Sequence, residues 1–151
     1  MKPVRYLSFA LLCAFFFPAA AQHIIIHNPL NNSSVPQYGN TVTFSTTGSL
    51  TVGYSPVVFV RSPDGGQWPY LGADQNRSDW TLNNVQFGIT ANHHKIFRVA
   101  VIIISDQMID HGFDYHGNKI YIQNNTPLSQ EIFDFLCNSN AHSTTVYVTR
   151  L

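Results

Sequence analysis

Hydrophobic and polar residues alternate along several short stretches of the chain, as they do in β-strands. Residues 41–46 follow a period of two, which predicts a strand with one buried face. The run at residues 101–104 is continuously apolar and predicts a buried strand. Strands are expected at residues 24–26, 41–46, 57–61, 67–71, 79–87, 97–104, 119–123 and 143–150.

Turn-forming and polar residues separate these strands. Residues 30–40 are rich in Asn, Ser and Pro and predict a loop. Pro63, Asp64 and Gly65 predict a turn, because proline presets φ and glycine accepts a positive φ. Residues 106–118 are polar and mixed in character. We expect one domain without an internal repeat.

One segment near the end has the spacing of a helix. Thr126 and Pro127 are typical of the cap and the first position of a helix. Apolar residues then recur at positions 128, 132, 135 and 136, which predicts one apolar face. Polar residues at 138–140 end the segment. A series of strands with one short helix before the last strand predicts a mainly β fold, a β-sandwich.

The first 21 residues have the features of a secretory signal peptide. Lys2 and Arg5 precede an apolar stretch at residues 6–17, and a proline and three alanines follow it. This stretch is shorter than the roughly 20 residues that a membrane-spanning helix needs. We therefore expect cleavage after Ala21, a secreted or periplasmic location and a single domain at residues 22–151. No membrane insertion is expected after cleavage.

Charge and cysteine content narrow the classes of partner and chemistry. The chain has eight Lys or Arg and eight Asp or Glu residues. Without Lys2 and Arg5, six basic side chains remain against the eight acidic ones, so we expect no nucleic-acid partner. Cys137 would be the only cysteine left, which excludes an intramolecular disulfide. We expect it to be buried in the helix, because free cysteine is usually buried.

A succession of aromatic and aliphatic strand motifs covers most of residues 24–150. It comprises Ile26-x-x-Pro29, Val57-Val58-Phe59-Val60, Trp68-Pro69-Tyr70, Trp80, Val85-x-Phe87-Gly88, Phe97-x-Val99-x-Val101 and Val146-Tyr147-Val148-Thr149-Arg150. This order resembles that of a group of bacterial extracytoplasmic Ig-like domains. The resemblance implies an Ig-like antiparallel β-sandwich with one short α-helix before the last strand. It also implies a recognition or accessory role at the cell surface or in the envelope.

The chain departs from that pattern in a longer segment at residues 106–125, where we expect any individual function to lie. Asp110, His111, Asp114 and His116 form its densest group of metal-capable side chains, of the types that bind zinc or similar ions. Their spacing matches neither H-E-x-x-H nor an EF-hand, so a solvated polar loop is the favoured interpretation. The histidines at 93–94 can approach this group only if both loops share one end of the sandwich.

Signatures of hydrolytic catalysis are absent from the sequence. There is no G-x-S-x-G elbow, and Glu131 is the only glutamate, on the predicted helix. We therefore expect neither enzymatic activity nor a cofactor. The alternative is a divalent-metal-binding or metal-dependent hydrolytic protein that uses the Asp/His group at residues 110–116.

Two aromatic residues are candidate ligand-binding residues. Trp68 and Tyr70 are of the types enriched at binding surfaces, so they suit a sugar or a peptide, and Trp68 lies at a turn edge. Trp80 is expected in the core. The leading hypothesis is a monomeric, non-catalytic recognition module that binds an unknown protein or envelope component through loops at one end of the sandwich. Pairing of exposed strand edges into an oligomer is a third possibility.

Overall fold

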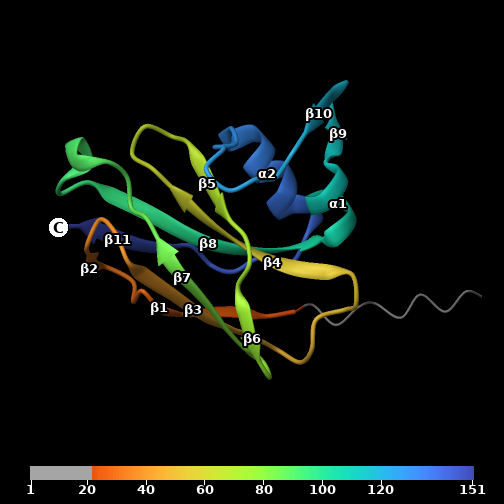
Figure 1. Ribbon diagram of the computed structural model, residues 1–151, viewed down its shortest axis with the longest axis horizontal. Coiled ribbons are helices and arrows are strands. Elements are labelled where there is room, and N and C mark those ends of the chain that lie inside the picture. Colours follow the sequence, from red (N-terminus) through yellow and green to blue (C-terminus); the bar gives the residue numbers. More distant parts are fainter. Residues whose placement is uncertain (1–21) are drawn as a thin grey trace, which may run out of the picture.

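Two β-sheets pack face to face in the computed structural model, which describes residues 22–151 (Figure 1). The first sheet orders its strands β1 (Ile24–Asn28), β3 (Asn40–Thr46), β7 (Asp79–Val85) and β6 (Asp74–Asn76), all of them antiparallel to their neighbours. The second sheet orders its strands β2 (Ser33–Val35), β11 (Val146–Arg150), β8 (Ile96–Ser105), β4 (Tyr54–Arg61) and β5 (Gln67–Tyr70). The expected β-sandwich is confirmed, whereas the expected signal peptide at residues 1–21 lies outside the described residues.

Strands β4 and β8 run side by side through the middle of the second sheet and are buried on both faces. Val58 and Val101, which are Cα partners, face the core between the two sheets. Phe59 and Ile102 alternate with them and face a second core on the outer side. All four side chains are almost completely inaccessible to water. Burial on both faces explains the continuous apolar run at residues 101–104.

Helices and a hairpin cover the outer face of the second sheet and form a third layer (Figure 1). They are α1 (Asp106–His111), β9 (Phe113–Tyr115), β10 (Asn118–Ile120) and α2 (Gln130–Ser139). Phe133 of α2 contacts Phe59 edge to face, with ring centroids 5.3 Å apart. Leu136 of α2 is fully buried in the same outer core. The amphipathic helix expected before the last strand is therefore present and packs as its apolar face predicts.

The start of α2 differs from the sequence-based expectation. The helix begins at Gln130, not near Thr126, and the Ser129 hydroxyl caps it by accepting a hydrogen bond from the Ile132 amide at 3.3 Å. Leu128 instead exchanges two backbone hydrogen bonds with Gln67, at 3.0 and 2.8 Å. This bridge extends the edge of the sheet and keeps the segment before Ser129 in an extended conformation.

The sequence also missed several short elements. The segment from residue 106, for which the sequence indicated only a polar and mixed character, forms α1 and the β9–β10 hairpin up to Ile120, so the described part of the chain has two α-helices instead of one. Ser105 caps α1 by accepting a hydrogen bond from the Met108 amide at 3.3 Å. The predicted loop at 30–40 contains β2, which pairs in parallel with β11. Strand β6 and the 3₁₀ turn η1 (Thr90–Asn92) were also not expected.

Candidate functional site

A pocket of about 260 Å³ opens at one end of the sandwich, where β5 and the segment after β7 meet the turn that follows β4. Trp68 and Tyr70, the two aromatic residues singled out in the sequence, both line it. They are separated by one residue on β5, so their side chains project from the same face of the strand. The structure thus brings the predicted pair into one hollow, the Trp68 pocket.

Trp68 is partly exposed, and its indole N–H is a hydrogen-bond donor. Its indole N–H makes no hydrogen bond within the described part of the chain. Gly66 lies beside it, and a Cβ added to Gly66 would stand 3.1 Å from Trp68 Nε1. A side chain at Gly66 would therefore crowd the indole N–H, which glycine avoids.

Tyr70 is anchored by its hydroxyl group. The hydroxyl donates a hydrogen bond to the Gln86 carbonyl oxygen at 3.0 Å and accepts one from the Gln86 amide at 3.3 Å. Burial raises the pKa of Tyr70 above its ordinary value, and the bond to the Gln86 backbone partly opposes this. The hydroxyl is therefore protonated at neutral pH, and the ring serves as a fixed wall of the pocket.

The segment after β7 supplies the opposite wall. Gly88 has a φ of +72°, and a Cβ at this position would lie 2.5 Å from Phe97 Cζ, so only glycine fits there. Asn92 Oδ1 accepts a hydrogen bond from the Ile89 amide at 2.9 Å, and the Arg150 guanidinium donates to the Ile89 carbonyl oxygen. The backbone is held on both sides, while the Ile89 side chain is 63% exposed at the pocket.

Polar groups surround this apolar interior. Val60 and Phe97 are buried and form part of the lining, and Asp64, Asn92 and Asn125 contribute polar side chains. A mostly apolar hollow with a few directed polar groups is typical of binding sites for small ligands. The arrangement can accept a ring with one apolar face and several hydrogen-bonding groups.

The predicted metal group lies at the other end of the molecule. Asp110 and His111 are at the end of α1, Asp114 is on β9 and His116 follows in the hairpin turn, all of them exposed. Within residues 22–151, no group of three His, Cys, Asp or Glu side chains gathers closely enough to hold a metal ion. The structure therefore leaves these four residues as a row of solvated side chains.

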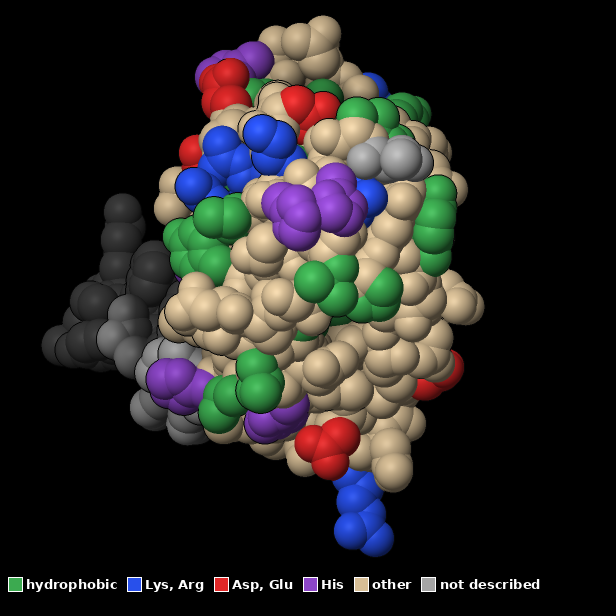
Figure 2. All heavy atoms as spheres, turned by 90° about the vertical axis from the view of Figure 1, so that its left-hand side faces the viewer, with side chains coloured by type: hydrophobic (Ala, Val, Ile, Leu, Met, Phe, Trp, Pro, Cys, Tyr) green, Lys and Arg blue, Asp and Glu red, His purple; other side chains and the backbone are tan. Residues whose placement is uncertain are grey.

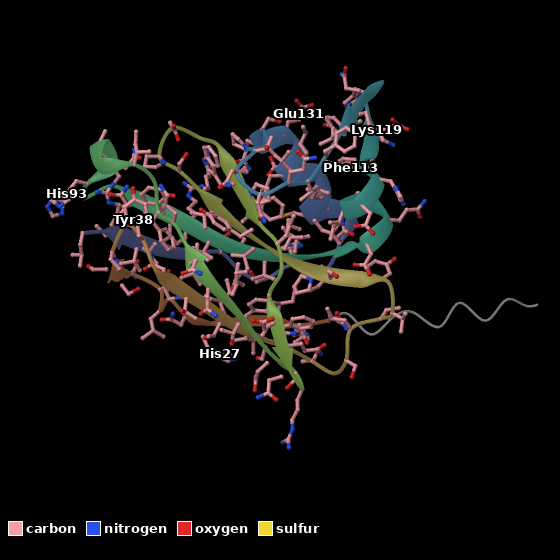
Figure 3. The ribbon with its side chains drawn as sticks, in the orientation of Figure 1. His27, Tyr38, His93, Phe113, Lys119 and Glu131 are labelled. Atoms are coloured by element: carbon pink, nitrogen blue, oxygen red, sulfur yellow. The ribbon has the colours of Figure 1, made fainter. Side chains whose placement is uncertain are left out.

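The histidine pair cannot join that group. His93 and His94 precede β8, whereas the Asp/His segment follows it, so they lie at opposite ends of this strand (Figure 3). A strand rises about 3.3 Å per residue, and β8 has 10 residues. The two imidazole rings contact each other instead, with centroids 3.9 Å apart.

Two further ionisable groups, Cys137 and Tyr115, lie in α2 and beside it. Cys137 is partly buried, and burial together with the nearby Asp134 carboxylate raises its pKa to about 11. The thiol is therefore protonated at neutral pH and lacks the low pKa of a nucleophilic cysteine. Tyr115 donates a hydrogen bond to Glu131 Oε1 at 2.9 Å, and this bond raises the pKa of Tyr115.

Sequence reasoning missed most of the residues around the Trp68 pocket. Gln86, Ile89, Asn92 and Asn125 come from segments that are distant in sequence and carry no common motif. One local signal was available in the sequence. Ile89 is a single apolar residue between Gly88 and the mostly polar residues 90–95, which is typical of an apolar side chain in an exposed loop. The remaining positions depend on tertiary packing.

Comparison with known proteins gives no relative: no family model matches the chain, and no curated protein matches its sequence. Neither helix in the described residues has the length and the apolar content of a membrane-spanning segment.

Proposed function

We propose that this chain is an exported, non-catalytic recognition module that binds an envelope component through the Trp68 pocket. The observation that carries the proposal is the pairing of Trp68 and Tyr70 in one hollow with polar side chains around it. Aromatic side chains with an apolar face and a polar tip are enriched at binding surfaces.

The ligand group that suits the pocket best is a sugar ring of an envelope glycan. A pyranose has an apolar face, which can lie against an aromatic ring, and hydroxyl groups on its edge. The free indole N–H of Trp68 offers a donor, and the Asp64 carboxylate and the Asn125 amide offer further polar partners. A volume of about 260 Å³ suits one ring, not a long ligand.

The fixed backbone around the pocket supports recognition by a preformed site. Tyr70 is bonded to Gln86, and Asn92 and Arg150 both hold Ile89. A site that is ordered before binding loses less conformational entropy when the ligand enters. This favours affinity for a small group.

The lining residues also favour binding over hydrolysis. Asp64 is the sole carboxylate among the described residues that line the pocket. Glycoside hydrolysis ordinarily needs a pair of carboxyl groups, one of them acting as an acid.

The signal-like residues 1–21 support the proposal that the chain is exported. Mass spectrometry of the secreted or periplasmic protein should find Gln22 at its N-terminus.

Titration with glycan fragments tests the function. A peptidoglycan disaccharide, neutral monosaccharides and unrelated peptides are added separately to the wild type and to Trp68→Ala, and binding is followed by calorimetry. We expect saturable binding of a saccharide that Trp68→Ala weakens about tenfold or more. Tyr54→Ala is the matched control, because Tyr54 is an exposed aromatic residue at the other end of β4.

The outcomes separate the possibilities. Circular dichroism must first show that both variants keep the wild-type strand content. Binding of a peptide but no saccharide would contradict the proposed glycan ligand and indicate a protein partner instead. Equal losses in Trp68→Ala and Tyr54→Ala, or no binding of any probe, would overturn the pocket as the recognition site.

A further inference from the structure

Beside the Trp68 pocket lies a groove of about 500 Å³ in which basic side chains gather. We call it the basic groove; its ionisable residues are Arg61, His94, Lys95, Arg98 and Tyr147. Figure 2 shows Lys and Arg side chains next to a pair of His side chains on this end of the molecule. Half of the six Lys and Arg residues in 22–151 therefore lie in one groove, although that part of the chain has more acidic than basic residues.

Sheet pairing places the two arginines together. Arg61 of β4 and Arg98 of β8 are direct Cα partners, and Arg98 is in turn the partner of Tyr147 on β11. The three residues form one row across the outer face of the second sheet. Like charges directly opposite each other on antiparallel strands are destabilising, so this pairing disfavours the unliganded fold.

Among the described residues, no acidic side chain pairs with these two arginines. Within residues 22–151, neither Arg61 nor Arg98 forms an ion pair. Asp134 of α2 lines an adjoining hollow together with both arginines, but its Oδ1 accepts a hydrogen bond from Gln130 at 2.6 Å instead. No carboxylate lines the basic groove itself among the described residues.

Tyr147 keeps one of these charges in place. The guanidinium carbon of Arg98 lies 5.4 Å from the centroid of the Tyr147 ring, at cation–π distance. Guanidinium groups offer paired N–H donors that match the oxygens of a phosphate group. Ile96, 60% exposed, and Tyr147, 40% exposed, add apolar surface beside these donors.

We propose that the basic groove binds a phosphate group carried on a larger molecule. The phosphate oxygens accept hydrogen bonds from Arg61 and Arg98, with Lys95 adding a third positive charge. The apolar surface of Ile96 and Tyr147 contacts the remainder of that molecule. This site is distinct from the Trp68 pocket, which it adjoins at Ser62.

Pyrophosphate is the probe for this site, titrated calorimetrically into the full-length protein at low ionic strength. The expected dissociation constant is about 1 mM or lower, and Arg98→Gln and Arg61→Gln each weaken binding about tenfold or more. Arg77→Gln is the matched control, because Arg77 is an exposed arginine in the β6–β7 turn. Trp68→Ala should leave pyrophosphate binding unchanged, so the two sites can fail independently.

The melting temperature provides a second readout, which does not require calorimetry. Removing one of two opposed charges should raise the melting temperature of unliganded Arg61→Gln, while Arg77→Gln should leave it unchanged. Pyrophosphate should raise the melting temperature of the wild type by more than that of Arg61→Gln, which binds it about tenfold more weakly. Absence of binding near 10 mM, about tenfold above the expected constant, or an equal loss in Arg77→Gln, would overturn the proposal.

Vesicles distinguish the source of the phosphate. The soluble source is expected, so vesicles containing phosphatidylglycerol should not retain the protein in sedimentation, whereas pyrophosphate should still bind. If the vesicles retain the wild type and Arg77→Gln but not Arg98→Gln, the phosphate source is a lipid headgroup and not a soluble molecule.

Discussion

The Tyr70 hydroxyl donates a hydrogen bond to the Gln86 carbonyl oxygen at 3.0 Å and accepts one from the Gln86 amide at 3.3 Å. Tyr70 is on β5 of the second sheet, whereas Gln86 directly follows β7 of the first sheet. One side chain therefore satisfies both backbone groups of a residue in the connection between the sheets. It also fixes the wall of the Trp68 pocket.

Replacing Tyr70 by Phe should remove this tie and keep the ring. We expect a loss of about 1 kcal/mol in the free energy of unfolding, with additional cost for the unpaired Gln86 groups. Denaturant unfolding measures the loss, and amide hydrogen exchange should become faster at Gln86. Tyr54→Phe is the control, since Tyr54 has no side-chain hydrogen bond in the described structure and should lose almost nothing. Equal stability of the two variants would show that the bonds to Gln86 contribute nothing.

Gly88 and Gly48 provide a matched pair for the geometry of the pocket. Both have a positive φ, +72° and +75°, but a Cβ at Gly88 would lie 2.5 Å from Phe97 Cζ, while nothing lies within 4 Å at Gly48. Gly48→Ala should cost about 1 kcal/mol, the strain of the left-handed backbone alone. Gly88→Ala should cost clearly more in thermal or denaturant unfolding. A smaller loss in Gly88→Ala would contradict the close packing of this turn.

Long, strongly patterned strands could be predicted from the sequence. The alternation at residues 41–46 and the apolar run at 101–104 correspond to β3 and to the twice-buried β8. Strand β2 could not be predicted, because its three residues form a strand only by pairing with the distant β11. The start of α2 was misplaced because Leu128 bonds to Gln67, a contact that local propensity does not encode.

The site could be predicted only in part. Trp68 and Tyr70 share a hollow because strand periodicity places them on one face. Asp110 and His116, by contrast, do not gather with other metal-capable side chains within the described residues. Asp110 is in α1 and His116 is in the β9–β10 turn, so these elements spread them along the surface. The pairing of Arg61 with Arg98 depends on strand register and could not be read from the composition.

Burial on both faces of the second sheet predicts a large effect at its centre. Ile102 faces the outer core and is fully buried, so Ile102→Ala should lower the free energy of unfolding by about 2–5 kcal/mol. Ile25 on the edge strand β1 is 55% exposed, and Ile25→Ala should cost about 0.5 kcal/mol or less. Chemical denaturation measures both. Similar losses would mean that α2 does not bury the outer face in solution.

Cys137 predicts a distinctive pH dependence. Its pKa of about 11 exceeds the ordinary value of 9.0, so the thiol should react slowly with iodoacetamide at neutral pH and faster as the pH approaches 11. Mass spectrometry of the peptide that contains Cys137 measures the rate. Denatured protein, with an ordinary thiol, should react faster at every pH below 11.

The same shift affects stability. Because the folded pKa is raised, the unfolded thiol ionises first, and stability present below pH 9.0 is lost as the pH rises to about 11. Cys137→Ala should remove this part of the pH dependence. Rapid labelling of the folded protein at pH 7 would contradict the burial of the thiol.

The most direct test of the central claim is the ¹⁵N indole signal of Trp68 during titration with a peptidoglycan disaccharide. Trp80 is an internal reference, because it is buried and its Nε1 donates to Thr46 Oγ1 at 3.4 Å. Recognition through the pocket predicts a saturable shift of the Trp68 indole N–H signal while that of Trp80 stays in place. No shift of the Trp68 signal, or equal shifts of both signals, would contradict it.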